Sequence, residues 1–283
     1  MTEISQTQVK NQKFGISQGR LTESEQLQKF PSEDWQAEFY NAQKVGINFI
    51  ELLTEREFNK DNPVWSISGR QEIKDVCAAT KCEIYSICID YIINHSLLDD
   101  RTALENVRRV FAVASDLGCK VVIFPLLEES NLIPFNSKRF AEMFILLAAE
   151  AANHNLMICV ETLMKASDLV EFLERVNRDN VKAVFDTGNR VVVSDGSDLH
   201  KEILCLDAFI AHVHVKDKNG SGENVILGTG LVDFRTVFSA LKRINYRGPL
   251  NFETTRGRDP LATATFHLTL CKFFQDEVNK DIY

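Results

Sequence analysis

Short apolar runs alternate with longer amphipathic stretches along the chain. The short runs are rich in Val, Ile and Phe, which is typical of strands buried on both faces. In the longer stretches apolar residues recur at helical spacing, as Trp35, Phe39 and Ala42 do in the first of them. The pattern predicts strands over 13–17, 47–53, 83–90, 120–127, 156–161, 181–186, 209–217 and 249–253.

Local signals mark where helices begin and end. Ser32 opens the first helix as a capping residue followed by acids, and Gly46 ends it. Ser68 and Gln71 have the spacing of a capping box before the second helix. Further helices are expected near 104–117, over 137–154, 167–175 and 199–206, around 234–241, and from 260 onward.

This order of elements predicts a single (β/α)8 TIM barrel over 13–283, preceded by a flexible tail at 1–12. Strand and helix alternate with no shift of composition, and successive strands are far enough apart for right-handed crossovers. A doubly wound open sheet is the structural alternative. The first strand lacks the glycine-rich turn of a dinucleotide fold, and candidate ligands end four consecutive strands, which favours the barrel.

Composition narrows the class of protein. The net charge of −8 over 283 residues argues against nucleic acid as the main partner, because such proteins usually carry basic faces. No apolar run approaches a membrane span, and the first twelve residues are polar rather than signal-like. The seven cysteines include no CxxC pair, which favours reduced thiols. We expect a cytoplasmic protein without a membrane partner; a homodimer or homotetramer is compatible with the sequence.

Three acids and one histidine mark the ends of the last four strands. Glu161, Asp186 and Glu253 each stand where a strand passes into a loop, and His214 lies near the end of its strand. In parallel, adjacent strands these side chains would converge at one rim. Three oxygen ligands and one imidazole suit a divalent cation such as Mn²⁺, Mg²⁺, Co²⁺ or Zn²⁺.

These positions belong to a larger set of motifs that resembles a known family. The set comprises Glu161, Asp186-Thr-Gly-Asn189, His214-Val-Lys-Asp217, Gly228-Thr-Gly-Leu-Val-Asp-Phe234 and Glu253. It resembles the xylose isomerase-like TIM-barrel superfamily, and within it sugar-phosphate isomerases and epimerases such as L-ribulose-5-phosphate (L-xylulose-5-phosphate) 3-epimerase. The resemblance covers roughly 14–256 and implies that Glu161, Asp186, His214 and Glu253 bind one divalent metal ion.

The resemblance also implies a reaction. The metal would chelate a ketose or ketose phosphate through its carbonyl and the neighbouring hydroxyl, and would stabilise an enediolate. Glu161 and Glu253 would be the catalytic proton carriers, one removing the α-proton and the other returning a proton to the opposite face.

Other side chains are expected to bind the substrate. Arg20, Lys216 and Arg256 lie where loops follow strands and would hold a phosphate or carboxylate, although Lys216 also suits a structural salt bridge. Asn189 would hydrogen-bond a sugar hydroxyl. Glu51 would reach the site or pair with a neighbouring base.

Two further groups are interpreted from their positions alone. Backbone N–H groups of Gly228-Thr-Gly230 would bind an anion. His212 shares a face with His214 but lies one layer deeper, which favours an interior, hydrogen-bonded histidine over a ligand.

The departures from the family pattern bear on the substrate. Relatives acting on free ketohexoses have a histidine three residues after the aspartate of strand six, where this chain has Asn189. They also have an arginine shortly after the histidine of strand seven, whereas Lys216-Asp-Lys-Asn-Gly follows here. Both differences favour a pentulose phosphate, but the Gly15–Arg20 segment is not typical of that epimerase, and the sugar is left open.

Two other functions suit the same fold. A metal-dependent dehydratase of a cyclic polyol or a dehydroshikimate-like acid shares the first step and then loses water. A DNA-repair nuclease similar to endonuclease IV, which has this fold, uses a trinuclear zinc site with several extra histidines. This chain has six histidines, few of them at strand ends, and its negative net charge opposes DNA.

Overall fold

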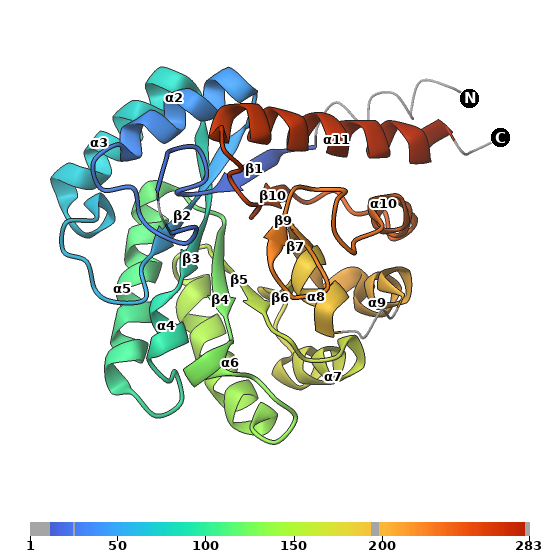
Figure 1. Cartoon of the computed structure of the whole chain (residues 1–283). Helices are drawn as coiled ribbons and strands as arrows, with labels where there is room; N and C mark the ends of the chain where they lie inside the picture. The colour runs from blue at the N-terminus through green and yellow to red at the C-terminus, as the bar shows by residue number, and fades with distance from the viewer. Residues whose placement is uncertain (1–11, 25, 194–197, 281–283) are drawn as a thin grey trace, which may run out of the picture.

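Eight parallel strands form a closed barrel in the computed structural model, which describes residues 12–24, 26–193 and 198–280 (Figure 1). The barrel strands are β1 (Phe14–Ser17), β2 (Phe49–Thr54), β3 (Glu83–Ile89), β4 (Val121–Pro125), β5 (Met157–Glu161), β6 (Val181–Asp186), β7 (Ile210–Val215) and β10 (Leu250–Phe252). Strand β10 pairs with β1 and closes the barrel. The predicted (β/α)8 TIM barrel is therefore confirmed, and the open sheet is excluded.

Long helices surround the barrel (Figure 1). They are α2 (Trp35–Val45), α3 (Ile67–Thr80), α5 (Arg101–Leu117), α6 (Ser137–Ala152), α7 (Ala166–Val176), α9 (Leu199–Leu206), α10 (Phe234–Arg243) and α11 (Pro260–Lys280). All of these were expected from the sequence. None of the helices in the described ranges is both long and apolar enough to cross a bilayer.

Several short elements were not predicted. They are η1 (Pro63–Trp65), α4 (Tyr91–Asn94), η2 (Glu128–Ser130), α8 (Thr187–Val193), η3 (Asp207–Phe209), and the antiparallel pair β8 (Asp217–Lys218) with β9 (Asn224–Val225). Each has too few residues to show a periodic apolar pattern. Helix α8 matters most, because it continues directly from β6 and carries Asn189.

The first and last residues of the helices test the capping signals predicted from the sequence. Gly46 and Gly118 end α2 and α5 with φ of 87° and 75°, the left-handed conformation that glycine adopts at low cost. The capping box at Ser68 was wrong, because Ser66 caps α3 and accepts a hydrogen bond from Gly69 N at 2.9 Å. Helix α2 also begins later than Ser32, at Trp35.

The core has an apolar layer between barrel and helices and a mixed layer inside the barrel, where a small apolar cluster that includes Val121, Ile123 and Cys159 lies on the strand faces opposite that outer layer. Phenylalanines such as Phe111, Phe124 and Phe144 fill the space between barrel and helices, and burial of each such side chain contributes about 2–3 kcal/mol. Inside the barrel, Ser17 pairs in register with Glu51 of the next strand. A polar interior at this end of the barrel leaves room for hydrogen-bonded side chains beneath the loops.

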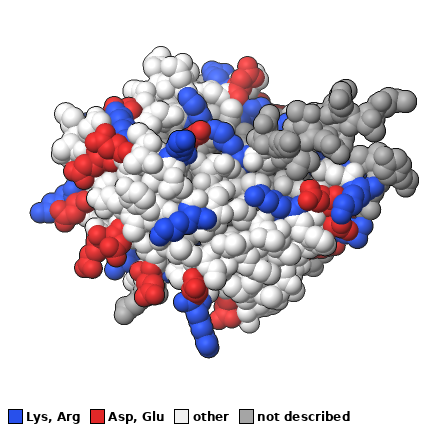
Figure 2. Space-filling model, turned by 90° about the horizontal axis from the view of Figure 1, so that it is seen from above, with Lys and Arg blue, Asp and Glu red and all other residues white. Residues whose placement is uncertain are grey.

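The remaining expectations about the chain concern its surface and ends. The thiols are all free, five are buried and Cys205 is exposed. Seen from above, Lys and Arg lie interspersed with Asp and Glu on the described part of the face in Figure 2. Most of the expected tail at 1–12 lies outside the described residues; Gln12, which is described, donates a hydrogen bond to Gly248 O.

Candidate active site

Four side chains named from the sequence lie together at the C-terminal end of the barrel. Glu161, Asp186, His214 and Glu253 each offer a ligand atom, and these atoms all lie within 4.8 Å of one another. His214 Nδ1 is 3.2 Å from Glu253 Oε2, 3.6 Å from Glu161 Oε2 and 3.9 Å from Asp186 Oδ2. The imidazole nitrogen thus faces three carboxylates that come from three different strand ends.

The opposite edge of the His214 ring, which carries Nε2, contacts Glu51. His214 Nε2 lies 3.1 Å from Glu51 Oε1, so a proton on Nε2 is favoured by the carboxylate beside it. Both ring nitrogens are buried without a hydrogen-bond partner among the described residues. Burial opposes a charge on the ring, but Glu51, Glu253 and Glu161 raise the pKa of His214 well above its ordinary value. A cation would bind at Nδ1, the nitrogen that faces the three carboxylates, once Nδ1 has lost its proton. A carboxylate that orients a histidine in this way is the usual arrangement behind a metal ligand. The donor set and the unpartnered Nδ1 therefore fit a divalent cation.

Glu51 lies beneath the cluster, inside the barrel. It accepts hydrogen bonds from Ser17 Oγ at 3.2 Å, Ser86 Oγ at 2.7 Å and Asn251 Nδ2 at 3.0 Å. Its side chain is almost fully buried. The structure therefore places Glu51 next to His214, in agreement with the interpretation that it pairs with a neighbouring base. It lies away from the open side of the barrel, where a substrate would bind.

His212 occupies the layer below His214. Its side chain is fully buried, its Nε2 is 3.1 Å from Glu51 Oε2, and its ring centroid is 5.2 Å from that of His214. Burial lowers the pKa of His212 despite the neighbouring carboxylate. This environment is that of an interior histidine. Glu51, His212 and His214 also form a group with metal-ligand spacing, but hydrogen bonds already engage Glu51.

Lys216 lies at the cluster rather than at its edge. Its Nζ is 2.8 Å from Asp186 Oδ2 and 2.7 Å from Glu253 Oε2. Burial opposes the charge on the ammonium, but the attraction of Asp186 and Glu253 outweighs it and raises the pKa of Lys216. The salt-bridge interpretation therefore describes the observed contacts, and Lys216 brings a positive charge into the site.

The two glutamates of the cluster differ in electrostatic environment. Burial raises the pKa of Glu161 to about 8, with a further contribution from the nearby carboxylates of Glu253 and Asp186. Burial acts in the same direction on Glu253, but attraction to Lys216 and His214 holds its pKa well below the ordinary value. The cations of the cluster therefore do not offset the mutual repulsion of its carboxylates at Glu161. A bound metal ion would favour the ionised form of the Glu161 carboxylate.

Asn189 contacts two members of the cluster. Its Nδ2 donates to Glu161 Oε1 at 2.8 Å, and its backbone N donates to Asp186 Oδ1 at 2.7 Å. The side chain is half-buried, in the first turn of α8. In this structure Asn189 fixes the Glu161 carboxylate; its expected contact with a sugar hydroxyl stays a prediction.

Arg20 lies beside Glu253. Its Nη2 is 3.8 Å from Glu253 Oε1 and donates to Gln28 Oε1 at 2.6 Å, while its Nη1 donates to Leu27 O. Its Nε is buried without a hydrogen-bond partner among the described residues. This guanidinium is therefore close enough to the cluster to meet an anionic group of a substrate.

Arg256 lies after β10, where a loop follows a strand, as expected. It donates hydrogen bonds to the backbone oxygens of Thr22 and Gln26. These bonds attach the segment after β10 to the loop that follows β1. The structure thus shows Arg256 holding a loop; its expected contact with a substrate stays a prediction.

Sequence reasoning missed Glu38 on α2. Its carboxylate is fully buried and accepts hydrogen bonds from Gly19 N at 2.5 Å, Leu21 N at 2.9 Å and Thr22 Oγ1 at 2.9 Å. Burial raises the pKa of Glu38, and these donors act against that effect. The residue fixes both neighbours of Arg20. The signal that could have identified Glu38 is its place in the middle of an apolar helix face, where an acid is unusual.

The anion-binding interpretation of Gly228-Thr-Gly230 was wrong. Gly228 N and Gly230 N both donate to Asp217 Oδ2 at 2.9 Å, and Val232 N donates to Asp217 Oδ1 at 3.0 Å. The N–H groups are therefore already satisfied by a fully buried carboxylate of the chain itself. Asp217 was quoted only as part of a motif, and its role is to fold the loop after β7.

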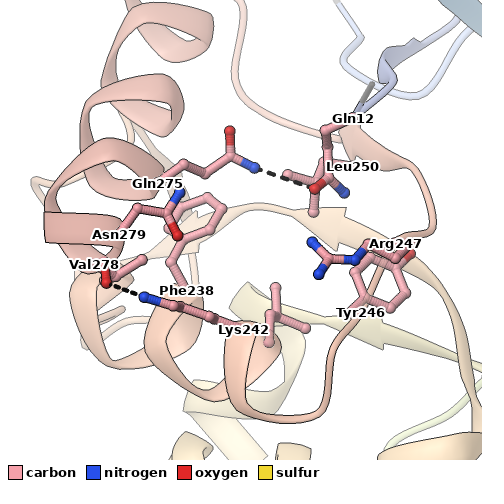
Figure 3. Close-up of a pocket in the computed structure, with 10 residues that line it drawn as sticks. Gln12, Phe238, Lys242, Tyr246, Arg247, Leu250, Gln275, Val278 and Asn279 are labelled. Carbon is pink, nitrogen blue, oxygen red and sulfur yellow. Dashed lines mark hydrogen bonds between the residues drawn. The ribbon is translucent and has the colours of Figure 1, made fainter. Parts of the chain in front are cut away.

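A separate pocket lies at the opposite end of the barrel (Figure 3). Phe238 and Lys242 of α10 and Gln275 of α11 line it together with Leu250, the first residue of β10. Because Glu253 follows the other end of β10, this pocket is separated from the cluster by the length of the strand. It contributes no side chain to the candidate active site.

A family comparison agrees with this fold. The model of the family described as "Xylose isomerase-like TIM barrel" matches residues 39–268. The chain belongs to this family. The family resemblance predicted from the sequence motifs is thereby confirmed.

Curated relatives of this xylose isomerase-like protein include sugar epimerases. An L-ribulose 3-epimerase of Methylomonas sp. is 39% identical over 83 residues, a match that spans 29% of this chain and 27% of that relative. An L-ribulose-5-phosphate 3-epimerase of Escherichia coli is 26% identical over 252 residues, which cover 81% of this chain and 86% of the relative.

Solved structures share the barrel. A structure of L-ribulose 3-epimerase superposes with a TM-score of 0.74 at 18% identity, covering 95% of this chain and 96% of that one. A xylose isomerase-like TIM barrel protein from Mycobacterium smegmatis, in complex with magnesium, has a TM-score of 0.73 at 16% identity, covering 96% and 99% of the two chains. These likenesses show the fold.

Proposed function

We propose that this protein is a divalent-metal-dependent epimerase or isomerase of a ketose or ketose phosphate. The observation that carries the proposal is the convergence of Glu161, Asp186, His214 and Glu253 on one buried point. The relatives named L-ribulose-5-phosphate 3-epimerase and L-ribulose 3-epimerase support the same class of enzyme. Action on a small sugar in the cytoplasm, without nucleic acid or membrane partners, belongs to the proposal, as does assembly into a homodimer or homotetramer.

Glu161, Asp186, His214 and Glu253 would hold the cation, which is Mn²⁺, Mg²⁺, Co²⁺ or Zn²⁺. When bound, the cation supplies positive charge that stabilises oxyanion character on nearby substrate oxygens. The protein contributes the orientation of the site. Glu51 fixes the His214 ring from below, and Asn189 fixes Glu161 from the side.

The two glutamates supply the proton transfers. Glu161 ends β5 and Glu253 follows β10, with β6 and β7 between them in the barrel. They therefore approach the cluster from different sides, as epimerisation requires of a group that removes a proton and a group that returns one. A positioned general acid or base contributes about 10²–10⁴-fold to such a reaction.

Two cations beside the cluster suit an anionic group of the substrate. Arg20 and Lys216 are buried cations at the cluster, and burial limits the number of water molecules that compete for them. A phosphate on the ketose would match them. Together with the long match to the L-ribulose-5-phosphate 3-epimerase, this favours a pentulose phosphate over a free sugar.

A substrate panel tests the proposal. The enzyme loaded with Mn²⁺ is incubated in D₂O with L-ribulose 5-phosphate, L-ribulose or D-psicose, and NMR follows loss of the proton on the carbon next to the carbonyl. We expect exchange and formation of the C3 epimer, fastest with the phosphate, and loss of both after chelation. Loss of water from a cyclic substrate instead would indicate a dehydratase, and no exchange with any ketose would contradict the proposal.

A further inference from the structure

Lys216 contacts the same carboxylate oxygens that the candidate cation site requires. Its Nζ lies 2.8 Å from Asp186 Oδ2 and 2.7 Å from Glu253 Oε2. These two oxygens also face His214 Nδ1, at 3.9 and 3.2 Å. An ammonium and a divalent cation repel each other strongly at such separations in a buried site. The two cations therefore compete for one position.

The position of Lys216 is built by its neighbours. Thr187 Oγ1 accepts a hydrogen bond from Lys216 N at 2.9 Å and donates one to Lys216 O at 2.5 Å. Gly188 gives the side chain its space, because a Cβ there would lie 2.8 Å from Lys216 Cγ. The backbone and the first carbons are thus held in place. The ammonium is the end that can move, through the rotatable bonds of the stem.

We propose that the Lys216 ammonium is a resident counter-ion, which a divalent cation displaces when it binds between Asp186, Glu253 and His214. This inference rests on the proposed function and deepens it, because it gives Lys216 two positions. In the first position the ammonium pairs with two of the buried carboxylates. In the second it has left them, is still tethered beside the site, and is available to an anionic group of the substrate.

Metal binding without substrate tests the exchange. The variant Lys216→Met and the wild type are stripped of metal and titrated with Mn²⁺ in a calorimeter. We expect the variant to bind Mn²⁺ at least about tenfold more tightly, because the ion no longer displaces a bound charge. Lys182→Met is the matched control: Lys182 lies near the other end of β6, is half-buried and donates to Ala208 O, so its loss should leave the affinity unchanged.

An affinity for Mn²⁺ that is equal or weaker in Lys216→Met would overturn the proposal. The variant leaves buried carboxylates without their counter-ion, so its folding is measured as well, together with that of Lys216→Gln. Folding that requires Mn²⁺ only in these two variants supports the exchange, since the ion then replaces the ammonium. Failure of both to fold at every Mn²⁺ concentration contradicts it.

Failure of the proposed function has a different signature. If no ketose is converted while Lys216→Met still binds Mn²⁺ more tightly than the wild type, the exchange stands and the reaction class falls. If neither the wild type nor the variants bind Mn²⁺, the metal centre and the exchange are both wrong.

Discussion

Glu51 Oε1 lies 3.1 Å from His214 Nε2, at the buried end of the imidazole. Through this contact the interior of the barrel determines which nitrogen of His214 faces Glu161, Asp186 and Glu253. A polar residue deep in the barrel thus acts on the site without touching its open side. Its effect should appear in metal affinity.

The first prediction concerns Glu51. Glu51→Gln replaces the carboxylate by an amide, which no longer holds a proton on His214 Nε2 by charge and can present an N–H to it. Changes of this kind typically weaken metal binding about 10–100-fold. Mn²⁺ titration of the stripped protein measures the effect. Ser86→Ala, which removes one hydrogen bond to Glu51, should cost far less; equal affinity in Glu51→Gln and wild type would refute the orienting role.

The second prediction concerns the loop after β7. Asp217→Asn places an amide group where Asp217 Oδ2 accepts hydrogen bonds from Gly228 N and Gly230 N, so donors would face donors. Hydrogen bonds to charged groups contribute about 1.5–3 kcal/mol each, and we expect a loss of at least about 2 kcal/mol in the free energy of unfolding. Urea denaturation checks this. Glu223→Gln in the same loop is exposed and should change little.

The sequence predicted the site best where its residues stand at the ends of strands. Glu161, Asp186 and Glu253 could be placed because each acid ends a run that reads as a buried strand, and parallel strands bring their ends to one rim. The contact between Glu51 and His214 could not be predicted, because it depends on how far each side chain reaches across the barrel. Segment 228–230 misled because a glycine-rich run does not reveal that Asp217 already satisfies its amides.

The third prediction concerns Glu38. Its carboxylate holds the backbone on both sides of Arg20, through Gly19 N and Leu21 N, and does not touch the cluster. Glu38→Gln keeps the size but turns one acceptor into a donor, so the loop should loosen and Arg20 should lose its fixed position. We expect a higher KM for a phosphorylated ketose with unchanged Mn²⁺ affinity. Glu33→Gln, exposed before the same helix, is the control; an unchanged KM in Glu38→Gln would contradict the role.

The last prediction concerns the two glutamates that would transfer protons. Glu161→Gln and Glu253→Gln each keep an oxygen for the cation but remove a carboxylate base. Turnover of the ketose should fall by at least about 10²–10⁴-fold in each, the range that general acid–base steps supply. Both variants should fold, because these residues lie at the rim of the barrel and contribute little to the apolar core.

Deuterium exchange separates the two roles. The variant that retains the abstracting glutamate should still exchange the α-proton of the ketose with D₂O, while it fails to form the epimer. The other variant should do neither. NMR in D₂O measures exchange and epimer formation in one sample, with Glu129→Gln, exposed in the loop after β4, as the control for removal of a charge. Epimerisation inverts a carbon through two opposed proton-transfer groups and so requires both glutamates. Near-wild-type epimerisation in Glu161→Gln or Glu253→Gln would show that the substituted glutamate is only a metal ligand.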